Sequence, residues 1–321
     1  MTGRRTQGVV LLSMLLVMAL LSAIAWQLMG RHSLVIAQAR FTFGGDQALE
    51  YVLGAEAFAR QILYEEWTRN GPDKDTLLEV WAQPTAPFEV DNGFLEVQVI
   101  DMHRCFNLNS LAGQGWQQNL ERLKTLLRNR DVPETLADAW KDWVDADIDI
   151  HGFGAEDGEY LGEEIPYRTA NAPAAHVTEL RLVRGIEAEH LEALEGVLCV
   201  LPSTELDINV NTAGAAVLAS LSPNLAEAQM QALTESVRDY DDVSQLTTEF
   251  PDLAAAVDAL GVSSEYFRIN ARAQVDGNQA ELSSLVRREP TSGRVELISR
   301  DLGRNFQSLF TAQTEDGEEG E

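Results

Sequence analysis

A long apolar stretch lies near the N-terminus of the chain. Residues 9–29 (VVLLSMLLVMALLSAIAWQLM) contain no charged side chain. A helix rises about 1.5 Å per residue, so this stretch is long enough to cross a hydrocarbon core of about 30 Å. Arg4 and Arg5 precede it, and the positive-inside rule then predicts a cytoplasmic N-terminus. The pattern predicts one transmembrane helix, with the bulk of the chain on the opposite side.

The same helix is expected to continue beyond the membrane. Apolar residues between Gln47 and Trp67 recur at spacings of three and four, which is the period of an amphipathic helix. Gly44-Gly45 is expected to kink or soften this helix, and Gly71-Pro72 is expected to end it.

Strand patterns lie on both sides of a long helical region. Alternation of apolar and polar residues predicts strands over 94–100, 267–275, 280–287 and 294–299, with turns at Asp276-Gly-Asn278 and Thr291-Ser-Gly293. Between them, residues 111–262 read as helical, interrupted by one acidic loop. The economical fold is α+β, with a long N-terminal helix packed on one antiparallel sheet and a large α-helical domain inserted between its strands.

Charge restricts the class of partner. The net charge is −27 and the pI is near 4.4, so the surface repels phosphate backbones and argues against nucleic-acid binding. Converging carboxylates would instead attract divalent cations. Cys105 and Cys199 are too few for a zinc cluster. They form either one disulfide outside the cytoplasm or two buried thiols.

The acidic loop 142–164 is the main candidate site. It holds nine carboxylates and no Lys or Arg, so it is either extended and solvated or wrapped around a cation. Asp145-x-Asp147-x-Asp149, with Glu156 at the twelfth position, follows the spacing of an EF-hand loop. Ile150 stands where that motif has its glycine. We therefore expect Ca²⁺ in an irregular site, with ligands among Asp145, Asp147, Asp149, Glu156 and Asp157.

Catalytic motifs are absent from the sequence. It contains no Gly-x-Ser-x-Gly, His-Glu-x-x-His or P-loop, and its five histidines are scattered. Paired carboxylates in the loop could still act as general acid and base, which keeps a membrane-anchored calcium-dependent enzyme as an alternative.

Two short segments form a weak internal repeat. Residues 171–186 and 207–221 both start with Asn and small residues and run into a Leu-rich helix. Residues 208–213 (INVNTA) resemble the start of a helix-hairpin-helix module, which would suggest a DNA-uptake protein. The Gly-Ile-Gly turn of that module is missing, because Ser222-Pro-Asn-Leu225 follows. A packed helical module is the preferred interpretation.

The N-terminal leader resembles the class III signal of type IV prepilins. A basic segment ends in Gly8 directly before the apolar stretch, which predicts cleavage between Gly8 and Val9 by a prepilin peptidase and methylation of the new amine. An uncleaved anchor is the alternative.

Taken together, the motifs resemble the K minor pseudopilins of the bacterial type II secretion system over nearly the whole chain. The resemblance rests on the leader, the apolar helix, Tyr160 and the segments 104–110 (RCFNLNS), 143–147 (WVDAD), 154–157 (GAED), 167–172 (YRTANA), 179–186 (ELRLVRGI) and 208–213 (INVNTA). It implies a pilin-like fold with an inserted SAM-like domain and calcium at the loop. It also implies a non-enzymatic role at the pseudopilus tip with minor pseudopilins I and J, then H and the major pseudopilin.

The resemblance also divides the chain. It implies a prepilin leader (1–8), a transmembrane helix (9–29) in the inner membrane, a pilin helix with the first strands (30–110), the inserted domain (111–262), C-terminal strands (263–313) and a disordered acidic tail (314–321). The bulk of the chain would be periplasmic. Ser13 stands at the fifth mature position, where most pilins have Glu. A tip subunit has no neighbour above to pair with that buried acid, so Ser13 fits this position.

Overall fold

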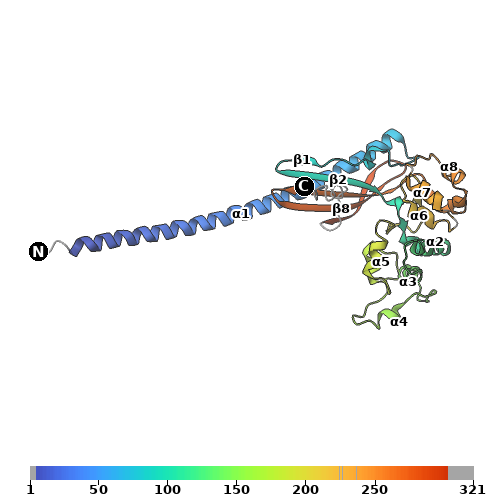
Figure 1. The fold of residues 1–321 in the computed structure, drawn as a ribbon, viewed down its shortest axis with the longest axis horizontal. Coiled ribbons are helices and arrows are strands. Elements are labelled where there is room, and N and C mark those ends of the chain that lie inside the picture. The colour runs from blue at the N-terminus through green and yellow to red at the C-terminus, as the bar shows by residue number, and fades with distance from the viewer. Residues whose placement is uncertain (1–4, 224, 226, 236, 303–321) are drawn as a thin grey trace, which may run out of the picture.

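One helix dominates the molecule. The computed structural model describes residues 5–223, 225, 227–235 and 237–302, so the expected acidic tail lies outside the described residues. Helix α1 (Arg5–Asn70) projects far beyond the rest of the chain (Figure 1). It ends as predicted, because Gly71 adopts a φ of 84° and its N–H donates to Trp67 O at 2.9 Å.

The glycine pair Gly44-Gly45 lies within α1. Helix α1 runs through both glycines without interruption. Gly44 lies against the hairpin that carries Asn278, and a Cβ at Gly44 would collide with the Asn278 side chain. The glycine therefore allows close approach of the helix to this hairpin.

An antiparallel sheet packs on the second half of α1. Within the described residues it has five strands in the order β1-β2-β7-β8-β9. The strands are β1 (Phe88–Val90), β2 (Gly93–Asp101), β7 (Tyr266–Val275), β8 (Asn278–Arg288) and β9 (Val295–Leu302). Strands β2 and β7 pair from Gly93 opposite Val275 to Asp101 opposite Phe267. The predicted sheet with an insertion between its strands is confirmed.

Apolar alternation explains how α1 holds the sheet. Every second residue of β7 from Phe267 to Val275 is fully buried, and these side chains meet two clusters on α1. The helix contributes Ala48, Val52, Ala55, Ala59 and Leu63. These buried apolar side chains hold the sheet on the helix.

The predicted turn at Asp276-Gly277 closes β7 and β8. Both residues have positive φ, at 49° and 80°, as a two-residue type I′ hairpin requires. Val275 and Asn278 then pair directly across the turn.

The inserted block is less regular than predicted. Its helices are α2 (Trp116–Arg128), α3 (Thr135–Val144), α4 (Asp157–Tyr160), α5 (Ala188–Ala193), α6 (Ala215–Ser220), α7 (Glu227–Glu235) and α8 (Val243–Glu249). Two short parallel pairs interrupt them: β3 (Phe106–Asn107) with β4 (Leu198–Cys199), and β5 (Ile208–Asn209) with β6 (Leu260–Gly261). Strands of two residues carry no periodicity, so the pattern could not reveal them.

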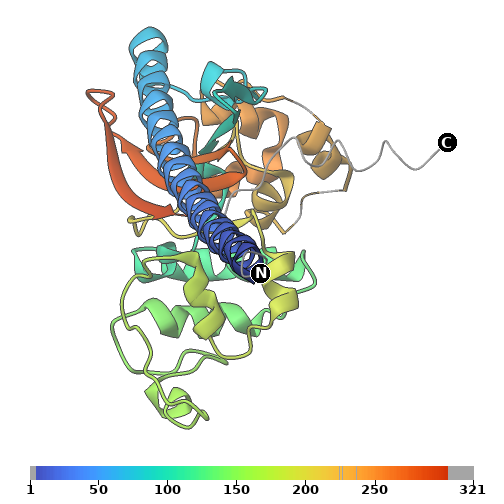
Figure 2. The ribbon, with the colours of Figure 1, turned by 90° about the vertical axis from the view of Figure 1, so that its left-hand side faces the viewer.

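The two repeat-like segments differ from each other. The helix expected in 207–221 is present as α6, after the short strand Ile208–Asn209, whereas in 171–186 the segment Val177–Leu182 is a 3₁₀ helix. The block nevertheless has one core of its own, in which Trp140 and Tyr160 are fully buried. It lies beside the sheet, and α4 occupies the edge remote from the sheet (Figures 1 and 2).

Candidate functional site

Three carboxylates converge in the loop between α3 and α4. Helix α3 ends at Val144, and α4 begins at Asp157. Oxygen atoms of Asp145, Asp147 and Glu156 lie within 4.8 Å of one another. These are positions 1, 3 and 12 of the predicted EF-hand-like spacing.

The other two predicted ligands lie outside this group of three. The backbone N–H of Asp149 donates to Asp147 Oδ1 at 2.9 Å, and Asp149 itself is exposed. Asp157 pairs with Arg168 at 2.7 Å and accepts from the Thr169 hydroxyl at 3.1 Å. Asp149 therefore shapes the turn, and Asp157 ties the start of α4 to the irregular segment around Arg168 and Thr169.

Two oxygens of the group lack partners. Asp145 Oδ1 and Glu156 Oε1 are buried and accept no hydrogen bond from any described residue. Burial raises the pKa of Glu156, and the charges of Asp145 and Asp147 raise it further. Buried polar atoms are normally satisfied. A hard cation with oxygen ligands would satisfy both atoms, so the residues present fit Ca²⁺.

Two carboxylates of α3 accept hydrogen bonds from the backbone of the loop. Asp142 is fully buried and accepts from the His151 N–H at 3.1 Å, while Asp138 accepts from the Phe153 N–H at 3.1 Å. Burial, followed by the charges of Asp145 and Glu156, raises the pKa of Asp142 to about 7.

Sequence reasoning assigned no site role to Asp138 or Asp142. The available signal was their spacing of four on one helix face before a Gly-x-Gly segment. A Cβ at Gly152 or Gly154 would collide with the carboxylate of Asp138 or Asp142, respectively. Gly152 also has a φ of 57°. Both glycines let the backbone close over the acids.

An aromatic cluster fixes both ends of the loop. Trp143 and Tyr160 meet edge to face with ring centroids 5.5 Å apart, and Tyr167 lies 5.2 Å from Tyr160. The Trp143 indole donates to Glu179 at 3.1 Å, and the Tyr160 hydroxyl accepts from the Arg184 N–H at 3.2 Å. The loop is therefore anchored in the core of the block.

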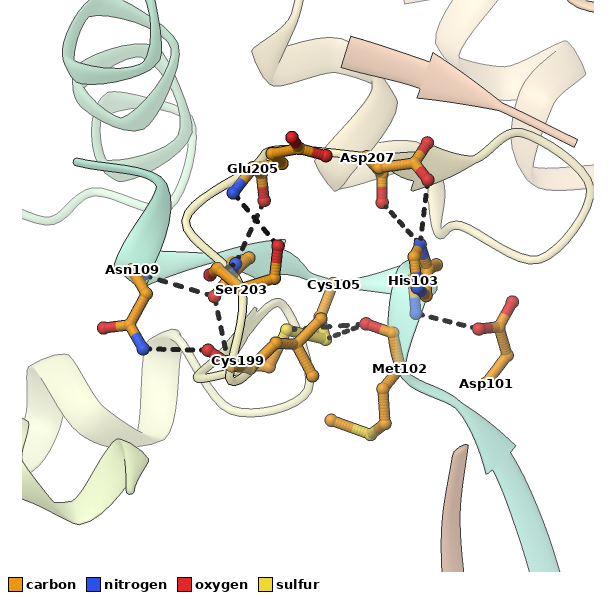
Figure 3. The surroundings of a disulfide bond; sticks show 11 residues. Asp101, Met102, His103, Cys105, Asn109, Cys199, Ser203, Glu205 and Asp207 are labelled. Atoms are coloured by element: carbon orange, nitrogen blue, oxygen red, sulfur yellow. Dashed lines mark hydrogen bonds and ion pairs between the residues drawn. A yellow bond between two sulfur atoms is a disulfide. The ribbon is translucent and has the colours of Figure 1, made fainter. Parts of the chain in front are cut away.

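A second constellation joins the block to the sheet. Cys105 and Cys199 form a disulfide with Cα atoms 5.8 Å apart (Figure 3), so the thiol alternative does not apply in this structure. Beside it, the Asn109 amide donates to Leu201 O at 2.8 Å. The bridge closes the block near the point where the chain leaves β2.

Asp101, at the end of β2, accepts several hydrogen bonds from the block. It accepts from Ser264 Oγ at 2.8 Å, from Asn209 Nδ2 at 3.2 Å and from the Thr212 hydroxyl. The His103 N–H donates to its other oxygen at 2.8 Å. Asn209 and Thr212 belong to the INVNTA segment, so this motif fastens the block to the sheet.

A cavity of about 770 Å³ opens at this junction, lined in part by His103, Asp207 and Tyr266. None of its lining residues belongs to the acidic loop. His103 contacts Asp207 O through Nδ1 at 3.0 Å and accepts from the Glu265 N–H through Nε2 at 3.2 Å. Both ring nitrogens are engaged, so this histidine does not offer a general base to the cavity.

The apolar stretch near the start of α1 is exposed. Among the described residues, one helix contains a stretch apolar enough to cross a membrane, with a mean hydropathy of 2.2 and no burial. Exposed apolar side chains continue past that stretch, and Phe41 and Phe43 are 73% and 72% exposed.

A single-span helix whose outer half packs on an antiparallel sheet defines a membrane-anchored, pilin-like protein, here with a large insertion. Residues 104–203 and 208–271 match the family described as type II secretion system (T2SS), protein K. The chain belongs to this family.

Relatives and a solved structure support the assignment over most of the chain. Type II secretion system protein K of Aeromonas hydrophila is 31% identical over 88% of this chain and 93% of the relative. The Pseudomonas aeruginosa protein is 32% identical over 94% of both. A chain in the crystal structure of the GspK-GspI-GspJ complex from enterotoxigenic Escherichia coli matches with a TM-score of 0.75 and 27% identity, covering 84% of this chain and 100% of that one.

Proposed function

We propose that this chain is a minor pseudopilin that sits once, at the tip of the type II secretion pseudopilus. The observation that carries the proposal is its fold match to a chain of a GspK-GspI-GspJ complex. The sheet and the inserted block together form a head on the outer half of α1, and the block extends to one side of the sheet (Figure 2). A head of this width cannot repeat in a tightly packed helical filament, because each copy must fit beneath the next.

Minor pseudopilins I and J are the proposed direct partners, with H and the major pseudopilin below them. Apolar side chains on α1 that do not pack on the sheet would meet their N-terminal helices. Phe58 is 55% and Tyr64 is 42% exposed, in addition to Phe41 and Phe43. Such faces bundle with other amphipathic helices. This complex would initiate the filament and support secretion of folded proteins, without catalysis by this chain.

The proposed topology places the N-terminus in the cytoplasm, α1 across the inner membrane and the head in the periplasm. Prepilin peptidase would cleave between Gly8 and Val9 and the new amine would be methylated. Ser13 then removes a membrane-buried carboxylate that has no neighbour to pair with at the tip.

Calcium is the proposed ligand of the acidic loop, held by Asp145, Asp147 and Glu156. The ion would satisfy the two buried oxygens without partners and reduce the repulsion among the three carboxylates. Ligand binding to the folded state alone stabilises it, so calcium would raise the melting temperature of the block.

Co-expression with pseudopilins I and J tests the tip assignment. The full chain should copurify with both, and deletion should impair secretion and change pseudopilus length. A Phe58→Ala/Tyr64→Ala variant should weaken copurification, whereas exposed Glu195→Ala on the block should serve as a control. Normal secretion after deletion, or this subunit all along sheared filaments, would show that the tip assignment is wrong.

Thermal melting of the full chain in detergent tests the cation proposal. Calcium should raise the melting temperature and a chelator should lower it. Asp145→Asn should abolish the response, and Asp149→Asn should retain most of it. A melting temperature that changes with neither calcium nor chelator contradicts the proposed site.

A further inference from the structure

A buried lysine lies beside the three carboxylates. Lys141 is on α3, one turn before Asp145, and its ammonium contacts Asp145 Oδ2. The two side chains are only 7% and 11% exposed. The face of Trp116 covers the ammonium at 4.6 Å from the ring centroid, and Trp116 in turn packs on His151 of the loop. Lys141 is thus held in position from both sides.

The two oxygens of Asp145 face different partners. Oδ2 accepts from Lys141, whereas Oδ1 is buried without a hydrogen bond from the described residues. Because Asp145 also belongs to the carboxylate group, its one side chain joins the ammonium to the proposed cation position. A cation bound to Oδ1 would therefore be only a few ångströms from a fixed positive charge.

We propose that Lys141 is a tethered counter-ion that keeps the loop folded without a divalent cation and weakens cation binding by repulsion. The inference rests on the proposed calcium site. Without calcium, the ammonium offsets the charge of Asp145, whose side chain is only 11% exposed and lies beside buried Glu156, where unpaired charge is costly. With calcium, the same ammonium repels the ion at short range. Lys141 would thus set the affinity of the site and limit how strongly the fold depends on calcium.

Calcium titration of the full chain in detergent tests this role, using Ca²⁺ alone as the probe. Lys141→Met replaces the ammonium with an unbranched apolar side chain that is one atom shorter, and removes the charge. We expect calcium binding at least about tenfold tighter by calorimetry. We also expect the chelated melting temperature to fall by about 10 °C and the rise on adding calcium to be larger than in the wild type.

Lys124→Met is the matched control. Lys124 lies on the neighbouring helix α2 and pairs with Asp138 at 3.0 Å, but it does not contact the group of three. This variant should lower stability without changing the calcium dissociation constant. Lys141→Gln repeats the test with a polar side chain. If Lys141→Met unfolds in chelator, refolding on calcium addition supports the proposal.

Two results would overturn the inference. Unchanged or weaker calcium binding in both Lys141 variants would mean that the lysine orients Asp145 for the cation or has no effect on it. An unchanged melting temperature in chelator would show that it does not stabilise the empty loop. Failure of the wild-type chain to bind calcium is a separate outcome, because it removes the proposed site itself.

Discussion

The pilin-like region and the inserted block are stabilised in different ways. In the pilin-like region, the outer half of α1 meets long strands through two apolar clusters. In the block, the longest helix has 13 residues, and many segments are irregular. Their positions depend on buried polar side chains such as Asn109, Asn209 and Asp101.

This difference indicates where single changes matter most. Apolar packing over a long interface distributes stabilisation over many side chains, so one contact is a small share. A buried polar group left without its partner pays the full desolvation cost. We therefore expect the block to be sensitive to the loss of one cross-link or one carboxylate, while the α1–sheet core stays intact.

Removing the disulfide should have the largest effect. Cys105 and Cys199 are separated by 94 residues, and a bridge closing a loop of this size contributes about 4 kcal/mol to the free energy of unfolding. The double Cys→Ser variant should expose the block to protease before the sheet. Equal loss of protection in β7 and in α2, measured by hydrogen exchange, would contradict the contrast between the regions.

Asp101→Ala should have the next largest effect, about 3 kcal/mol. The variant leaves the Asn209 amide and the Ser264 and Thr212 hydroxyls without their buried acceptor. Chemical denaturation of the full chain in detergent measures this loss. Thr85→Ala, which removes an exposed bond of 3.3 Å to Val97 O in the pilin-like region, is a control and should stay near wild type.

Asp142 should give the block a pH-dependent contribution to stability. Asp142 has a pKa of about 7 in the folded state and about 4 in an unfolded chain. The folded state therefore holds the extra proton between these values. The contribution of Asp142 to stability is therefore greatest below about pH 4 and is lost as pH rises through about 7. Asp142→Asn should remove on the order of 2 kcal/mol of that fall. Melting in chelator at both ends of the window tests this, and an unchanged slope would contradict it.

Gly45→Ala should have the smallest effect, in the opposite direction. A Cβ at Gly45 meets no atom within 4 Å, and alanine favours a helix over glycine by about 1 kcal/mol. The melting temperature of the pilin-like region should rise slightly. Gly93→Ala is the contrasting variant, because its Cβ would collide with the backbone of β7 and should destabilise the sheet. A destabilised Gly45→Ala variant would show that α1 must bend there.

Long-period patterns predicted the pilin-like region well. Alternation located β2, β7, β8 and β9 to within a few residues, and in β7 and β8 it reflects one face that is buried against α1 and the rest of the sheet. The short β1 was missed, since three exposed or half-buried residues carry no pattern. The close approach of Gly44 to Asn278 was not predicted, because it is a tertiary contact that no local pattern encodes.

Prediction of the block was weaker for a physical reason. Its contacts join residues far apart in the chain, such as Asp101 with Thr212, and no local period encodes them. Charge spacing did predict that Asp145, Asp147 and Glu156 lie close together, because all three belong to one short loop. Lys141 and Asp142 were overlooked as site residues because charged residues on a helix usually face solvent, whereas both are buried here.

The block is inserted at a point where it can be replaced without changing the sheet. The chain leaves the sheet after Asp101 and returns at Tyr266, and Asp101 lies directly opposite Phe267 on the neighbouring strand. A short hairpin could join these adjacent ends without altering strand order. The inserted block can thus be enlarged or replaced during evolution while α1 and the sheet keep their architecture. A chain carrying a hairpin in place of the block should retain the hydrogen-exchange protection of β7 and β8. Loss of that protection would show that the fold of α1 and the sheet depends on the block.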